Sequence, residues 1–265
     1  MIYVICFYWE GERWQEKQRL EGTFTNHLKR VGTVSRNLVS IYVNNLYWGV
    51  EEFADRPFRF VCFTNKDIPN LDNRVEVRDL PLFTKKGVLP RLYMFSRDAG
   101  LFGHQVLCLD LDVVIVGSLK KIFDYNGLFC ARTAYSDRKK QDRKVAPVDG
   151  DIMSFRAGEE TEELFWKPFV ENIEWAENYT QGRERYWMQY IANDWADRWE
   201  NDRIAPRRVI SYKKYLMGHR RKILPENASI VSCHGKPRPH QIKDEWRKKY
   251  WPYEEDYEEE LLQNT

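Results

Sequence analysis

Long apolar runs are missing from this chain of 265 residues, and that absence is the first constraint on its class. No stretch approaches the roughly 20 consecutive apolar residues that a membrane-spanning helix needs. The N-terminal residues also lack the basic segment and the small-residue cleavage site of a signal peptide, so Ile2–Tyr8 is predicted to be a first strand. We therefore expect a cytoplasmic protein without a transmembrane segment.

Cysteine is scarce and shows no pairing pattern. The five cysteines are an odd number, none belongs to a Cys-x-x-Cys pair, and each lies in an apolar run. A disulfide framework and a zinc site therefore have little support, and we expect buried thiols in a reducing compartment. These residues are Cys6, Cys62, Cys108, Cys130 and Cys233.

What the sequence does contain is an alternation of β-branched apolar runs with amphipathic stretches. This alternation predicts an α/β fold, a mostly parallel sheet flanked by helices. We expect one such domain over residues 1–240, followed by a basic helix and an acidic tail over residues 241–265. The predicted strands are Ile2–Tyr8, Phe58–Thr64, Val75–Asp79, Gln105–Leu109, Gly127–Ala131, Asp151–Phe155 and Ser229–Cys233. The predicted helices are Val34–Phe53, Leu89–Leu101, Glu159–Glu171 and Glu184–Trp195.

The net charge of only +2 conceals a strong segregation of charge along the chain. Residues 203–249 contain fourteen Lys or Arg and three Asp or Glu, a local charge of +11. Residues 254–260 then reverse the sign with six acids. Such segregation points to a polyanionic partner for the basic segment.

Two aspartates follow the apolar run 105–109. Asp110 and Asp112 are two positions apart, so in an extended chain both carboxylates point to the same side while Leu111 faces the core. Paired oxygen ligands suit Mg²⁺ or Mn²⁺, which complete their shells with substrate phosphates. A surface loop with two solvated acids would have the same spacing. The apolar runs on both sides favour the metal interpretation, because unpaired carboxylates flanked by core are costly without a cation.

A second polar element, His-Gly-Lys-Pro, directly follows the apolar run 229–233. A neutral His234 imidazole is a borderline metal ligand, and Lys236 can neutralise a phosphate. Gly235 would allow the backbone to approach a ligand closely. Taken alone, a turn capped by histidine and prolines explains the same residues.

Four elements, in this order, resemble the GT-A nucleotide-sugar glycosyltransferases. They are Leu-Pro-Arg-Leu-Tyr-Met-Phe at 89–95, Asp-x-Asp at 110–112, Val-Asp-Gly-Asp-Ile-Met-Ser-Phe at 148–155 and His-Gly-Lys-Pro at 234–237. The closest resemblance is to the retaining family of glycogenin and the bacterial lipooligosaccharide galactosyltransferases (glycosyltransferase family 8). It spans most of residues 1–240 and implies a GT-A fold. It also implies transfer of a hexose from a UDP-sugar, with Mn²⁺ or Mg²⁺ as cofactor and with retention of configuration.

The same resemblance implies roles for individual residues. Asp110, Asp112 and His234 would hold the metal ion that bridges the diphosphate of the donor. The expected donor contacts are Tyr8 at the nucleobase, Arg91 at the phosphate or the sugar, and Gly235 with Lys236 at the diphosphate. The expected carboxylates beside the sugar are Asp149, Asp151 and Glu184.

The chain departs from the family pattern at two places. The late loop of the family is spaced His-x-x-Gly-x-x-Lys-Pro, whereas here it is compressed, which weakens the roles of Gly235 and Lys236. A Gly-Asp-Gln element of the family corresponds to Gly182-Arg183-Glu184, so its acid has moved by one position. Asp149 and Asp151 would also fit as turn residues flanking Gly150.

The basic segment 203–249 admits three interpretations. The one we favour is an acceptor in duplex DNA, a hydroxymethylated pyrimidine such as 5-hydroxymethylcytosine, modified by a phage- or virus-encoded enzyme. A second is binding to anionic lipid, where the enzyme would extend a glycan or a lipid-linked oligosaccharide. The third is a solvated face that pairs with the acidic tail. The expected phosphate contacts are Arg207, Arg208, Lys213, Lys214, Arg220, Arg221 and Lys222.

Two hypotheses from other classes remain. A non-catalytic nucleic-acid-binding protein would explain the basic segment, but the sequence has no helix-turn-helix, zinc-finger or RNA-recognition signature. A metal-dependent nuclease or phosphotransferase would need a further acid cluster or a glycine-rich phosphate loop. Binding of a UDP-sugar that depends on Mn²⁺ would separate an enzyme from a binding protein.

Overall fold

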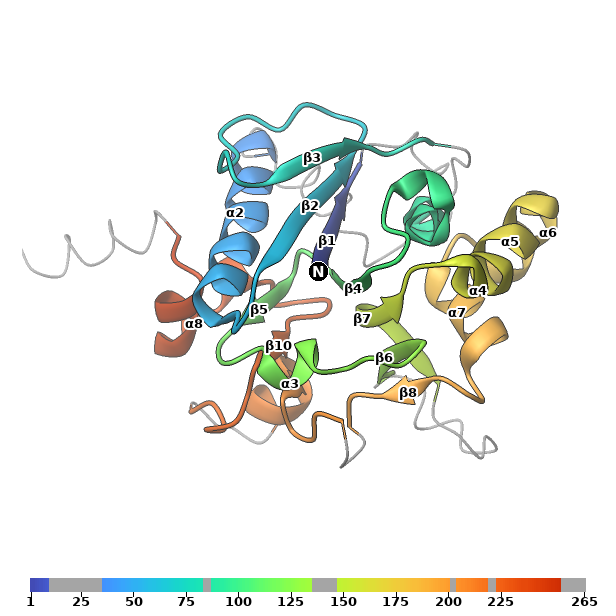
Figure 1. The fold of residues 1–265 in the computed structure, drawn as a ribbon. Helices are drawn as coiled ribbons and strands as arrows, with labels where there is room; N and C mark the ends of the chain where they lie inside the picture. The colour runs from blue at the N-terminus through green and yellow to red at the C-terminus, as the bar shows by residue number, and fades with distance from the viewer. Residues whose placement is uncertain (10–34, 83–86, 135–146, 201–203, 219–222, 254–265) are drawn as a thin grey trace, which may run out of the picture.

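The structure, a computed structural model, describes residues 1–9, 35–82, 87–134, 147–200, 204–218 and 223–253 (Figure 1). Its larger sheet has the strand order β3-β2-β1-β4-β7-β6-β8. β1 to β4 run parallel, β7 runs antiparallel to β4 and β6, and β8 is parallel to β6. The bounds are β1 Ile2–Tyr8, β2 Phe58–Thr64, β3 Glu76–Asp79, β4 Gln105–Leu109, β6 Phe129–Thr133, β7 Val148–Arg156 and β8 Asp197–Arg198. The predicted mixed, mostly parallel α/β sheet is confirmed.

The larger sheet is buried on both faces, and β1 shows why its sequence is a continuous apolar run. Because successive side chains of a strand point to opposite faces, Val4 and Cys6 pack in one core cluster while Ile5 and Phe7 pack in the other. Helix α2 (Ser35–Phe53) covers the first face, and α4 to α7 lie on the other side of the sheet (Figure 1). Both faces of the central strand are therefore closed to water.

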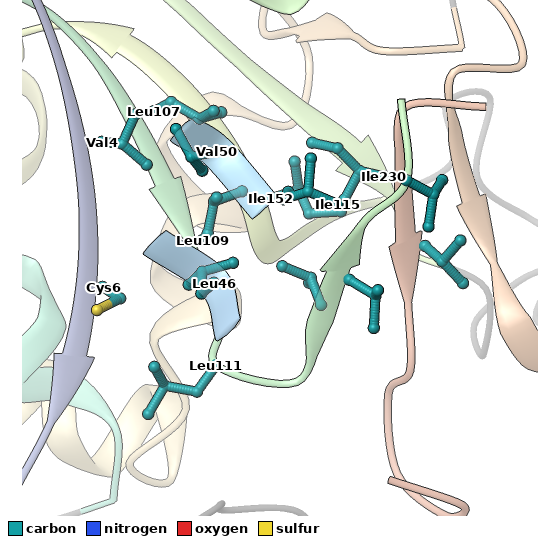
Figure 2. Close-up of a cluster of buried hydrophobic side chains, with 14 of the residues drawn as sticks. Val4, Cys6, Leu46, Val50, Leu107, Leu109, Leu111, Ile115, Ile152 and Ile230 are labelled. Carbon is teal, nitrogen blue, oxygen red and sulfur yellow. The ribbon is translucent and has the colours of Figure 1, made fainter. Parts of the chain in front are cut away.

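A smaller sheet with the strand order β5-β10-β9 continues the first core cluster. Its strands are β5 Val113–Ile115, β9 Val209–Ser211 and β10 Ile230–Ser232. Figure 2 shows Ile115 of β5 and Ile230 of β10 on adjacent strands, and Leu111 at the bend of the chain that leads into β5. Leu111 is buried in this cluster, as predicted. The apolar run around the aspartates is thus two strands in two sheets, joined by a turn at residues 110–112.

The helix predicted over Leu89–Leu101 is wrong in type. The structure has two 3₁₀ helices there, η1 (Leu89–Phe95) and η2 (Arg97–Ala99). Ser96 separates them with an extended backbone, and its hydroxyl accepts a hydrogen bond from the Asp98 amide at 3.1 Å. A serine that caps a new helix in this way competes with continuing the previous one.

The other predicted helices are confirmed with altered bounds. The stretch predicted at Glu159–Glu171 is α4 (Glu159–Thr161), the π-helical η4 (Glu162–Trp166) and α5 (Lys167–Glu171). It is followed by α6 (Ile173–Thr180) and by α7 (Glu184–Ala192), which ends three residues earlier than predicted. Three helices that the sequence analysis did not predict are α3 (Lys120–Phe123), the π-helical η5 (Tyr212–Met217) and the 3₁₀ helix η6 (Pro239–Gln241). No helix in the described ranges is both long enough and apolar enough to cross a membrane.

The C-terminal residues that the structure describes belong to the main core. A helix is present in the region predicted to be basic, α8 (Glu245–Tyr250). Trp246 and Trp251 are 7% and 0% exposed and join the first core cluster. The predicted acidic tail, residues 254–265, lies outside the described residues.

Candidate active site

The candidate active site lies where β4 ends, β7 begins and β10 ends. The Asp110 amide donates to the carbonyl of Asp151 at 2.8 Å, which extends the pairing of β4 with β7. The Cys233 amide donates to the carbonyl of Asp112 at 3.1 Å, which attaches the end of β10 to the same turn. The Asp-x-Asp turn is therefore held between two strands distant in sequence, at the carboxyl edge of β1, β2 and β4, where open α/β sheets bind ligands.

Arg91 joins three of the elements that the sequence analysis singled out. Its Nη1 lies 2.8 Å from Asp110 Oδ1 and donates to Glu184 Oε1 at 2.5 Å. Its Nη2 donates to the carbonyl of Gly150 at 2.9 Å. The guanidinium is buried, at 5% exposure of the residue, so it is a fixed positive charge between two carboxylates. The structure thus brings together Arg91, Asp110 and Glu184.

Two glycine contacts explain how this arrangement is built. The Val88 amide donates to the carbonyl of Gly182 at 2.8 Å, which ties the start of η1 to the residues before α7. Gly87 has φ of +62°, and a Cβ there would lie 2.0 Å from the Gly182 carbonyl oxygen, so the approach requires glycine. At Gly150 a Cβ would lie 2.7 Å from Glu184 Oε1. The absence of side chains at Gly87 and Gly150 therefore allows Glu184 to lie in contact with Arg91.

A second buried arginine, Arg132 on β6, was missed by the sequence analysis. It is 0% exposed and donates through Nε and Nη2 to Asp151 Oδ2, at 2.9 and 2.7 Å. Its Nη2 also donates to Asp149 Oδ2 at 2.9 Å, and the Ser232 hydroxyl donates to Asp151 Oδ2 at 2.5 Å. The carboxylate of Asp151 is therefore held by hydrogen bonds from Arg132 and Ser232, and it fixes the position of these two side chains in turn. Arg132 directly follows the predicted strand Gly127–Ala131, whereas β6 extends to Thr133 and includes it.

His234 and Gly235 follow β10 and lie beside a lysine assigned elsewhere by the sequence analysis. His234 Nε2 is 2.8 Å from the Ser211 hydroxyl. Burial, followed by the charge of Arg132, lowers the pKa of His234 to about 4, so its imidazole is neutral at pH 7. Gly235 has φ of +75°, and a Cβ there would lie 2.7 Å from Lys213 Nζ. Lys213, predicted as an acceptor contact, is thus at the loop predicted to bind the donor.

Arg238, also missed by the sequence analysis, forms an ion pair with Asp112. The two residues are 4% and 6% exposed. Lys236, predicted as the diphosphate contact, is exposed in the same loop. The Lys-Pro-Arg-Pro sequence therefore presents one cation to solvent and buries the next one against the Asp-x-Asp turn.

The predicted metal ligands are Asp110, Asp112 and His234. In the described part of the chain, no group of three or more His, Cys, Asp or Glu side chains is arranged to hold a metal ion. Asp112 is paired with Arg238 and Asp110 with Arg91, so an ion bound to either carboxylate would lie close to the positive charge of an arginine. As arranged, these residues do not fit a resident divalent ion. The use of Mn²⁺ or Mg²⁺ stays a prediction for experiment.

The carboxylates of the site have shifted pKa values. Enclosure by protein raises the pKa of Asp110 to about 7 against the opposing charge of Arg91, although 36% of its side chain remains exposed. Burial also raises the pKa of Glu184, and burial together with the Asp151 charge raises that of Asp149. For Asp151, burial is outweighed by the Arg132 charge and by hydrogen bonds from Arg132 and Ser232, which hold its pKa below the ordinary value. Such shifts are common where carboxylates crowd at functional sites.

Other predicted site residues lie apart from this cluster or are differently arranged. Tyr8 ends β1 at the expected edge, but it is 7% exposed and its side chain belongs to the core cluster. Arg207 and Lys214 are exposed, whereas Arg247 of the same basic segment is buried and donates to the Ile242 carbonyl at 2.5 Å. Arg208 is half-buried beside Ser229. Arg220, Arg221 and Lys222 lie outside the described residues.

No family model and no curated protein matches this chain. Solved glycosyltransferase structures do match its fold. The galactosyltransferase LgtC, in complex with donor and acceptor sugar analogs, matches with a TM-score of 0.59 at 13% identity, covering 94% of this chain and 93% of that one. GlyE of Streptococcus pneumoniae TIGR4 matches with a TM-score of 0.55 at 12% identity, covering 94% and 59%. The bifunctional glycosyltransferase WbbM matches with a TM-score of 0.51 at 11% identity, covering 94% and 51%.

These similarities establish the architecture of the chain. The match to LgtC extends over nearly the whole of both chains. At sequence identities of 11–13%, these matches show a shared fold and do not show shared substrates. The chain therefore has the GT-A fold of these glycosyltransferases, as the order of its motifs predicted.

Proposed function

We propose that the protein is a glycosyltransferase that moves a hexose from a UDP-sugar to a hydroxyl acceptor, with retention of configuration at the anomeric carbon. The observation that carries this proposal is the junction at Arg91, where Asp110 and Glu184 meet below the carboxyl edge of the sheet. It places two carboxylates with raised pKa values beside a loop rich in cations. The carboxylates form an acidic end of the site, which suits the positive charge that develops on a sugar. The cationic loop forms a basic end, which suits a departing diphosphate.

The acidic end would act on the sugar. As the bond from C1 to the phosphate oxygen breaks, positive charge develops on the sugar ring, and nearby carboxylates stabilise it electrostatically. Asp110 and Asp149 have 36% and 21% of their side chains exposed, so they can reach a substrate. Either could accept the proton of the acceptor hydroxyl as its oxygen bonds to C1. Glu184, with 7% of its side chain exposed, would position Arg91 and add to the negative field.

The basic end would act on the leaving group. Lys213 and Lys236 lie in or beside the 234–238 loop, and Gly235 leaves room for a close approach. The pKa of Lys213 is lowered by burial, which is the behaviour of a cation that lacks full hydration and gains from a bound anion. Neutral His234 can serve the phosphate oxygens only as a hydrogen-bond donor. These groups would offset the charge that the UDP acquires on departure.

The acceptor is proposed from charge. Duplex DNA carrying 5-hydroxymethylcytosine remains the acceptor predicted from the basic segment, and a glycan or lipid-linked oligosaccharide is the alternative. Three cations of the basic segment are not free to contact DNA. Lys213 lies beside Gly235 in the site, Arg238 is paired with Asp112, and Arg247 is buried. The described residues that remain for a DNA backbone therefore include Arg207 and Lys214, which are exposed.

The test is release of UDP from UDP-glucose, UDP-galactose and UDP-N-acetylglucosamine, with Mn²⁺ or with EDTA. Each is run with duplex DNA containing 5-hydroxymethylcytosine, with a mixture of oligosaccharides, and with neither. Release is expected, and Glu184→Gln should reduce it by about 100-fold. Glu160→Gln, the same change on exposed residue 160 of α4, is the matched control. Release that requires the modified DNA would establish that acceptor.

Two results would count against the proposal. If no UDP is released in any condition while the protein is folded, the non-catalytic nucleic-acid-binding hypothesis regains its place. If Glu184→Gln and Glu160→Gln behave alike, the site assignment is wrong even where transfer occurs. Retention is tested separately, because proton NMR of the first product formed distinguishes the α from the β anomer.

A further inference from the structure

A ridge of aromatic side chains lies on α6 and α7, outside the site described above. It consists of Trp175 and Tyr179 on α6 and of Tyr186 and Tyr190 on α7. Trp175, Tyr179 and Tyr190 are 41%, 50% and 55% exposed, although large apolar rings are normally covered. Figure 1 shows α6 and α7 together at the side of the molecule away from α2.

The rings of this aromatic ridge are arranged against one another. Trp175 and Tyr179 stack with their ring centroids 5.2 Å apart and 12° between the planes. Tyr190 meets both edge-on, at 5.4 and 5.3 Å. Buried Trp187 supports them from below, 6.1 Å from Trp175 and 5.8 Å from Tyr190. Because the rings already restrict one another, binding to their free faces would cost little side-chain entropy.

The ridge shares helix α7 with the candidate active site. Helix α7 begins at Glu184, which contacts Arg91, and Tyr186 follows two residues later. Arg183 donates to the Tyr186 hydroxyl at 3.0 Å, and its guanidinium lies over the same ring. Tyr190 is four residues beyond Tyr186, on the same helix face and about 9 Å from Glu184 along the axis. Because Glu184 and Tyr186 are two positions apart, they point to different sides of α7, so the ridge lies near the site along the helix and on another face of it.

Charge distinguishes the ligands that could cover this surface. Residues 171–190, which carry the ridge, contain Glu171, Glu174, Glu177 and Glu184 against Arg183 and Arg185, a net charge of −2. These carboxylates would repel the phosphates of nucleic acid and the headgroups of an anionic membrane. The faces of aromatic rings carry a negative quadrupole and attract C–H groups of small positive charge, and the hydroxyls of tyrosine add polar contacts. A neutral polyhydroxylated chain is not repelled by the carboxylates, and it offers both C–H groups and hydroxyls to the rings.

We infer that the aromatic ridge binds a carbohydrate chain, whose sugar rings stack on Trp175, Tyr179 and Tyr190. Binding of carbohydrate at the ridge does not require transfer. Its use for holding the distal part of an acceptor rests on the proposed function and would favour a glycan over DNA as that acceptor. The ridge would then raise the affinity for long acceptors and leave a single sugar unaffected.

Calorimetric titration with cellohexaose, maltohexaose and chitohexaose, without any nucleotide sugar, tests binding by itself. At least one hexasaccharide should bind the wild type more tightly than its monosaccharide does, and the double variant Trp175→Ala/Tyr190→Ala should weaken that binding about tenfold. Tyr190→Phe keeps the ring and should stay within about twofold of the wild type. Trp48→Ala removes a tryptophan of 42% exposure from α2 and serves as the control.

Three outcomes would overturn the inference. The first is no binding of any hexasaccharide by the wild type, and the second is equal affinity in the double variant. The third is a double variant that keeps its carbohydrate binding but loses binding to phosphatidylglycerol vesicles or to duplex DNA. If transfer to a sugar acceptor is observed, the double variant should raise KM for a hexasaccharide and leave KM for the methyl monosaccharide unchanged. Binding without transfer would retain the ridge and reject the proposed function.

Discussion

Gly150 lies so close to Glu184 that a methyl group at position 150 would be 2.7 Å from Glu184 Oε1. The same carboxylate accepts a hydrogen bond from Arg91 at 2.5 Å, and Arg91 also contacts the Gly150 carbonyl. The start of β7 and the start of α7 are thus joined through one guanidinium. Small changes here should alter the site before they alter the fold.

Gly150→Ala should therefore impair transfer more than stability. The added methyl group must push Glu184 away from Arg91, and a misplaced charge in a site costs roughly 100-fold in rate. The measurement is kcat with the best UDP-sugar donor, alongside the urea midpoint of unfolding. Ser154→Ala, on the same strand, is the control substitution. Normal kcat in Gly150→Ala would show that the position of Glu184 is unimportant.

Arg91→Lys should not replace the arginine. A lysine has a single ammonium group, whereas Arg91 contacts Asp110, Glu184 and the Gly150 carbonyl with two different nitrogens. We expect a loss of at least about 100-fold in kcat/KM. A lysine variant with nearly wild-type kcat/KM would mean that only the charge matters at this position.

Asp112→Asn should destabilise the protein because it leaves buried Arg238 without its ion pair. Removing one partner of a buried pair costs about 3–5 kcal/mol in the free energy of unfolding. The double variant Asp112→Leu/Arg238→Met removes both charges and should recover much of that loss. Chemical denaturation of the three proteins provides the comparison. Equal stability of Asp112→Asn and the wild type would show that the pair is not buried in solution.

Acid should weaken the fold through Asp151. Its pKa is lower in the folded state than the ordinary value of 3.8, so its contribution to stability is present above that pH and is lost as the pH falls through the folded-state pKa. Asp151→Asn should be less stable than the wild type at pH 7 and should lose less stability between about pH 4 and pH 2. Parallel curves of unfolding free energy against pH for the two proteins would contradict this assignment.

Binding of Mn²⁺ should be weak without the donor. Asp110 and Asp112 are both paired with arginines, so the free protein offers no group of ligands among its described residues. Calorimetric titration with Mn²⁺ is expected to show no site of micromolar affinity in the free protein. Repeating the titration with UDP present tests whether the phosphates provide the missing ligands. Tight binding to the free protein would show that the arginines yield to the ion and would restore the metal site as predicted from the sequence.

Local patterns in the sequence predicted six of the seven strands of the larger sheet and the helices α2 and α7, but they did not predict β5, β8 and β9. β1 is apolar at every position because both faces of a central strand are buried, and such a run is legible without a structure. Asp110, Asp149 and His234 follow or begin apolar runs, which places them at strand ends. The break between η1 and η2 was not predicted; it falls at Ser96, which caps the second of these helices.

The tertiary structure alone decided which charges meet. Arg91 and Glu184 are 93 positions apart, and no spacing rule connects them. Arg132 and Arg238 look like surface residues by type, yet the sheet buries each one against an aspartate. Lys213 came from a basic segment that suggested nucleic acid, and folding placed it beside Gly235. Sequence patterns report the environment of one residue at a time, whereas an ion pair is a property of two residues that only the packed chain brings together.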